Sequence, residues 1–139
     1  MSRRAWFGLA ALVAWTAFLW LNRLANAWGS EDESTADKVV STVLAGVLLA
    51  LAVAAMVVLV RTWRHPLTAG WARVLQVFAG VTVAVWAVRI PAIFLADHEL
   101  AFEVVHAVLG IVAIVLAVGV WRTATPVAGG SPRGPDRTR

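Results

Sequence analysis

The segment 39–60 reads VVSTVLAGVLLALAVAAMVVLV and contains no charged residue. A helix needs about 20 apolar residues to cross the hydrocarbon core of a bilayer, and a run of 18 or more with few charges is a strong candidate. This segment therefore predicts a transmembrane helix.

Outward from this segment, three more runs meet or approach the same criterion: 5–28, 74–96 and 101–121. Apolar residues make up 60% of the chain and charged residues only 14%, whereas soluble domains are near half apolar and a quarter charged. The sequence predicts an all-α transmembrane domain over 1–121, a four-helix bundle that crosses the membrane four times.

Charged residues are divided between the two sides of this predicted domain. Positively charged flanks are retained in the cytoplasm, and most basic residues flank one set of span ends: Arg3, Arg4, Arg61, Arg64, Arg73, Arg122, Arg133, Arg137 and Arg139. Most acidic residues lie in or beside the other two connections: Glu31, Asp32, Glu33, Asp37, Asp97, Glu99 and Glu103. We expect a multi-pass protein of the plasma membrane with both termini cytoplasmic.

The two ends of the chain carry further signals. The segment 122–139 is rich in Pro, Gly, Thr and Arg, which predicts a disordered basic cytoplasmic tail. At the other end, Arg3 and Arg4 before an apolar run, with Ala25 and Ala27 around Asn26 as a small-residue cleavage motif, also fit a signal peptide. Against cleavage, the apolar run is longer than the usual signal-peptide core, and Arg23 is unfavourable beside the cleavage position.

The sequence contains an internal repeat. A shift of 65 residues aligns KVVSTVLA at 38–45 with EVVHAVLG at 103–110, and a shift of 66 aligns the W-x-x-R motifs of Trp20–Arg23 and Trp86–Arg89. Such a repeat predicts two tandem helical hairpins related by an approximate twofold axis along the membrane normal. Small residues four apart, which let membrane helices approach closely, favour a packed bundle; they are Ala10/Ala14, Gly46/Ala50/Ala54, Gly80/Ala84 and Ala113/Ala117.

Polar residues inside the spans lie toward the ends that we predict to be external. Ionisable groups in a membrane span usually face a bundle interior or a wet cavity. The candidate polar layer consists of Asn22, Arg23, Asn26, Arg89, Glu103 and His106. Glu103 and His106 are three apart on one helix face, so we expect them to meet Arg89 across the bundle. The alternatives are a binding or proton-handling site and a structural salt-bridge layer.

Several kinds of chemistry find little support in the sequence. The absence of cysteine excludes disulfides and thiolate chemistry. The net charge of +4 comes without a basic stripe that would indicate nucleic acid. His106 is the only histidine in a span, which disfavours haem, and Asp97, His98, Glu99, Glu103 and His106 have no recognised metal-ligand spacing. We expect no cofactor, no metal and no enzymatic activity.

The second half of the chain carries a loose resemblance to known proteins. The motif WAVRIP at 86–91, followed by Asp97 and His98 and by FEVVHAVL at 102–109, resembles small four-span membrane proteins of actinobacterial type that have no assigned activity. This resemblance implies a membrane location and no particular function.

Two hypotheses for function follow from these patterns. The first is a noncatalytic accessory component that packs with itself or with a membrane partner complex, in contact with lipid and with anionic headgroups at the cytoplasmic face. The second is a small transporter or proton-coupled carrier that uses the polar layer. A cavity reaching past Arg89 toward the midplane favours the carrier, and a dry, fully paired layer favours the accessory role.

Overall fold

The computed structural model of the chain describes residues 1–31, 34–96 and 99–129. It contains four long helices in chain order, each long and apolar enough to cross a membrane: α1 (Arg3–Gly29), α2 (Thr35–Thr62), α3 (Ala69–Leu95) and α4 (Leu100–Ala128). The predicted all-α transmembrane fold is confirmed.

The helices extend beyond the apolar segments that predicted them. Ser34 caps α2, because its hydroxyl oxygen accepts a hydrogen bond from the backbone N–H of Asp37 at 3.2 Å, and the helix begins at Thr35. α4 continues past Trp121 to Ala128, so residues 122–128 are helical where we expected an unstructured tail; residues 130–139 lie outside the described part. Hydropathy identifies the apolar part of a span, whereas the hydrogen-bonded helical backbone continues into the polar sequence on either side of it.

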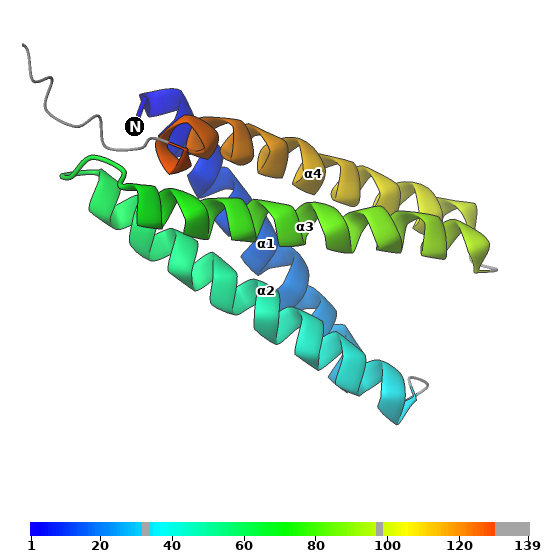
Figure 1. The fold of residues 1–139 in the computed structure, drawn as a ribbon. Coiled ribbons are helices and arrows are strands. Elements are labelled where there is room, and N and C mark those ends of the chain that lie inside the picture. Colours follow the sequence, from blue (N-terminus) through cyan, green and yellow to red (C-terminus); the bar gives the residue numbers. More distant parts are fainter. Residues whose placement is uncertain (32–33, 97–98, 130–139) are drawn as a thin grey trace, which may run out of the picture.

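The helices form two hairpins packed as a bundle (Figure 1). α1 packs mainly on α2 and α3 mainly on α4, and the hairpins contact each other through α1 with α4 and α2 with α3. They lie close together at the end that holds the N-terminus and the 63–68 connection, and they diverge toward the end where α1 and α3 end and α2 and α4 begin. We call these the closed end and the open end.

All four helices share one apolar core in the half of the bundle nearer the closed end. Its buried residues are Leu9, Leu12 and Val13 of α1; Ala52, Ala55, Val58 and Leu59 of α2; Ala72, Leu75, Phe78 and Ala79 of α3; and Ala117, Val120 and Ala124 of α4. Among the described residues, Phe78 is the bulkiest of the most deeply buried side chains, with no exposed surface. This core holds the two hairpins together.

Toward the open end, each hairpin packs around one buried tryptophan. Trp20 of α1 packs in a buried cluster with Ala45 and Leu48 of α2. In the second hairpin, the ring of Trp86 lies directly against the Cα of Gly110, leaving no room for a Cβ there. The repeat aligns Trp20 with Trp86 and Ala45 with Gly110, so the tryptophan of each hairpin lies beside the corresponding small residue of its own hairpin. These matching contacts support two tandem hairpins.

The predicted stripes of small residues describe the packing only in part. Ala113 and Ala117 of α4 are buried as expected. Gly46 and Ala50 of α2 are exposed, and the buried small residues of that helix are Ser41, Ala45, Ala52 and Ala55. In an alanine-rich helix the four-residue spacing occurs on several faces at once, so spacing alone does not identify the packed face.

Candidate functional site

A cleft of about 710 Å³ lies between the hairpins in the half of the bundle nearer the open end. Its walls come mainly from α1, α3 and α4, with one residue from α2: Phe18, Leu19, Trp20, Asn22, Arg23, Asn26, Asp37, Trp86, Arg89, Ile93, Phe102, His106 and Leu109. Binding pockets for small molecules usually have volumes of about 300–1,000 Å³. The cleft is therefore large enough to hold a ligand.

Arg89 is positioned by the packing of its own helix. Trp86, one turn earlier on α3, is fixed in the narrow space over Gly110 of α4, so Arg89 projects from a helix face whose rotation is set. The Arg89 guanidinium carbon lies 5.6 Å from the ring centroid of Trp20 in the other hairpin, within the range of a cation–π contact. The two tryptophans of the W-x-x-R motifs are both buried, and the one that Arg89 meets belongs to the other repeat.

The wall formed by α1 is polar at the same level. Asn22 donates a hydrogen bond from Nδ2 to the carbonyl oxygen of Phe18 at 2.7 Å. Asn26 follows one turn later, and half-buried Arg23 lines the cleft beside them. Arg23 and Arg89 both line the cleft, so two guanidinium groups border the same space. Like charges repel, and an anion between the two groups would offset that repulsion.

The wall formed by α4 carries an imidazole held in a fixed orientation. His106 Nδ1 lies 2.8 Å from the carbonyl oxygen of Phe102, and the two rings are in contact, with centroids 3.9 Å apart and planes tilted by 34°. Because a carbonyl oxygen can only accept, Nδ1 carries the hydrogen, and Nε2 is the ring nitrogen left for a ligand in the cleft.

The sequence placed Glu103 in this layer, and the structure does not place it on the cleft wall. Within residues 1–31, 34–96 and 99–129, no ion pair joins Arg89 to Glu103. The reason is geometric: successive helical residues are about 100° apart around the axis, and the α4 face toward the cleft is that of Phe102, His106 and Leu109. The expected three-way contact of Arg89, Glu103 and His106 is therefore not found among the described residues, whereas Arg89 and His106 both line the cleft.

The other five predicted residues, Asn22, Arg23, Asn26, Arg89 and His106, all line the cleft. Asp97 and His98, which we considered as metal ligands, lie outside the described residues. In the part of the chain that the structure describes, no three His, Asp or Glu side chains are grouped closely enough to hold a metal ion.

No family model matches the chain, and neither the curated proteins nor the solved structures include a significant match. The loose resemblance to actinobacterial four-span proteins therefore assigns it to no family.

Sequence reasoning missed one charged group and most of the apolar wall. Asp37 lines the cleft from the first turn of α2, where its carboxylate accepts a hydrogen bond from the Ser34 hydroxyl at 2.6 Å. A serine three residues before an acidic residue is a recognised helix start, so this signal was present in the sequence. The described cleft thus carries two guanidinium groups, one carboxylate and one histidine.

Proposed function

We propose that this protein is a noncatalytic, carrier-type membrane protein that binds an anionic ligand in the cleft between its hairpins. The observation that carries this proposal is Arg89. It lines an open cleft, its neighbours there include a second arginine, and the described structure gives it an aromatic contact with Trp20 and no carboxylate partner.

The depth of the cleft supports binding over a purely structural layer. Trp86 of α3 and Leu109 of α4 lie one turn nearer the middle of the bundle than Arg89 and His106, and both line the cleft. A register-fixing salt-bridge layer would be filled and paired. A cavity that continues past its arginine leaves space for a ligand to occupy.

We infer that the cleft opens toward the external side of the plasma membrane. The closed end carries the basic residues Arg3, Arg4, Arg61, Arg64 and Arg122 around the helix ends, whereas the open end carries Glu31, Asp37 and Glu99. Under the positive-inside rule the closed end is cytoplasmic. Arg61 and Trp71, whose guanidinium carbon and ring centroid lie 5.5 Å apart, would then meet the anionic headgroups of that leaflet.

The proposal is tested by ligand-dependent stability. A ligand that binds only the folded state at 100 times its Kd stabilises that state by about 2.7 kcal/mol. We expect a panel of carboxylates and phosphates, including single-chain lipids, to raise the unfolding temperature of the full chain in neutral detergent, and Arg89→Gln to abolish the rise. Arg73→Gln is the matched control, because Arg73 is exposed on the same helix and does not line the cleft. Equal responses from the two variants would reject the proposal.

An accessory role is a second candidate, favoured by the outward face of α2. Gly46 and Ala50 are exposed there between exposed Val43, Val47 and Val53, and small residues four apart allow a second membrane helix to approach closely. We expect crosslinking in native membranes to capture a dimer or a partner complex if this face is an interface. Gly46→Leu should then remove the crosslink, whereas a crosslink that persists in this variant would count against the α2 face.

A further inference from the structure

We propose that the ligand of the cleft is an anionic amphiphile, with a carboxylate or phosphate head and one apolar chain, which enters sideways from the bilayer between α1 and α4. This inference rests on the proposed anion-binding function and adds the class of ligand and its route.

The polar side chains of the cleft form a layer toward the open end: Asn22, Arg23 and Asn26 of α1, Asp37 of α2, Arg89 of α3 and His106 of α4. Two apolar side chains, Ile93 of α3 and Phe102 of α4, lie one turn beyond Arg89 and His106 toward the same end. The floor of the cleft, one turn deeper than the polar layer, is apolar and aromatic: Phe18, Leu19, Trp20, Trp86 and Leu109. A lipid in the adjacent leaflet has the same order, with its head outside and its chain toward the midplane. A small hydrophilic anion would leave this floor without a partner.

Contacts between α1 and α4 define a groove that opens sideways. Trp15 of α1 donates a hydrogen bond from Nε1 to the carbonyl oxygen of Leu109 at 3.2 Å, which ties the two helices at the bottom of the cleft. Beyond this tie the hairpins diverge toward the open end (Figure 1). Phe18 of α1 and Phe102 of α4 line the cleft above it and remain 57% and 43% exposed. An apolar chain lying in the groove would cover both rings.

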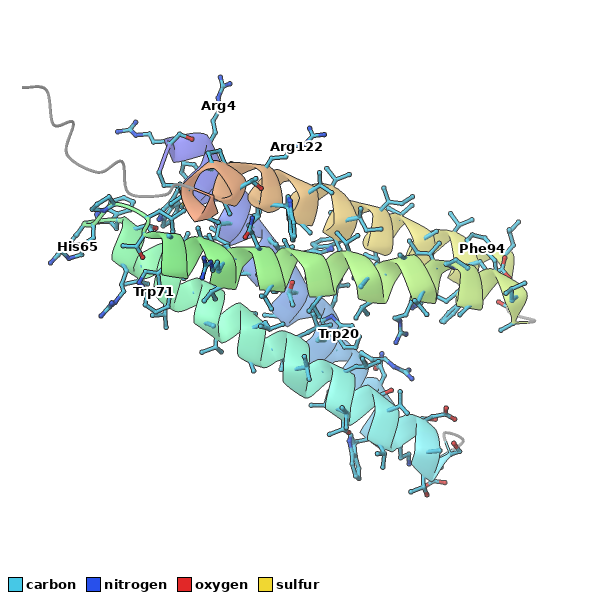
Figure 2. The ribbon with its side chains drawn as sticks, viewed as in Figure 1. Arg4, Trp20, His65, Trp71, Phe94 and Arg122 are labelled. Carbon is cyan, nitrogen blue, oxygen red and sulfur yellow. The ribbon has the colours of Figure 1, made fainter. Side chains whose placement is uncertain are left out.

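Tryptophan side chains occupy two other sides of the bundle at this depth. Trp86 fills the interface between α3 and α4 at Gly110. Trp20 packs on Ala45 and Leu48 between α1 and α2, and Val81 and Val85 of α3 are partly buried against the same cluster. Figure 2 shows Trp20 in the angle between α2 and α3. The α1–α4 side is therefore the route that we assign to the chain of the ligand.

The test uses two pairs of ligands that share a head group: oleate with acetate, and oleoyl lysophosphatidate with inorganic phosphate. Saturable binding is measured to the full chain in phosphatidylcholine nanodiscs, with empty nanodiscs as background. We expect at least one lipid to bind more than tenfold tighter than its short partner. Arg89→Gln should weaken that lipid at least tenfold, and Phe18→Ala should weaken it about fivefold without changing the binding of the short anion.

Phe94→Ala is the matched control, since Phe94 is 50% exposed on α3 and does not line the cleft; Figure 2 shows it near the open end. Because Phe18 is also exposed, its variant should fold normally, which an unchanged unfolding temperature will verify. If acetate or phosphate binds as tightly as its lipid and Phe18→Ala changes neither, the amphiphile is excluded while anion binding stands. If no ligand binds saturably, or Arg89→Gln changes nothing, both proposals fail together.

Discussion

Replacing Gly110 by alanine tests the packing that positions Arg89. A Cβ at this position would overlap the Trp86 ring and the Ile90 side chain. Overpacking of this kind costs about 1–3 kcal/mol, while glycine-to-alanine replacement inside a helix gains about 1 kcal/mol in propensity. The net destabilisation expected for Gly110→Ala is therefore about 0–2 kcal/mol.

Gly119→Ala is the matched control, because Gly119 lies on the same helix with no atom within 4 Å of an added Cβ. The propensity gain cancels between the two variants, so their free energies of unfolding should differ by the overpacking cost alone, about 1–3 kcal/mol. Reversible unfolding in mixed micelles measures this difference. Equal stabilities would show that Trp86 is not held against Gly110 and would remove the basis for the orientation of Arg89.

Three further predictions follow from the same structure. A double-mutant cycle with Arg89→Leu and Glu103→Leu should be additive within about 0.5 kcal/mol, since independent sites add; a coupling energy well above that value would show an ion pair that the structure lacks. Reporter fusions at the C-terminus and after Gly70 should read cytoplasmic, and a fusion near Glu99 external; an external C-terminus would reverse the proposed orientation. Mass spectrometry of the protein from native membranes should find the first helix retained, whereas a mature chain that starts at Trp28 would show cleavage.

The sequence predicted the four helices because their signal is local. A charge-free run such as 39–60 must satisfy its backbone internally in lipid, and a helix does so within one segment. The helix ends were predicted less accurately. The Ser34 cap and the continuation of α4 to Ala128 depend on hydrogen bonds in polar sequence, which a hydropathy pattern does not detect.

The sequence could identify unusual residues of the candidate site, but it could not predict which helix faces contact each other. Arg89 and His106 could be recognised as unusual residues for a membrane span, and both line the cleft. Glu103 was added on its spacing from His106, yet its direction depends on the rotation of α4, which the packing of Trp86 on Gly110 helps to set. The divergence of the hairpins is a tertiary property as well, and no residue pattern in the sequence encodes that angle.

The two hairpins are joined by the shared core at one end and separated by the cleft at the other, so a small rotation about the core displaces the walls of the cleft. Phe78, in the core, and Arg89, on the cleft wall, lie on the same helix, about 16 Å apart along its axis at 1.5 Å per residue. At that distance a rotation of about 4° between the hairpins moves the cleft wall by about 1 Å. A substitution that thickens the layer around Phe78 would thus change the width of the cleft, and with it ligand affinity, without touching any residue that lines it.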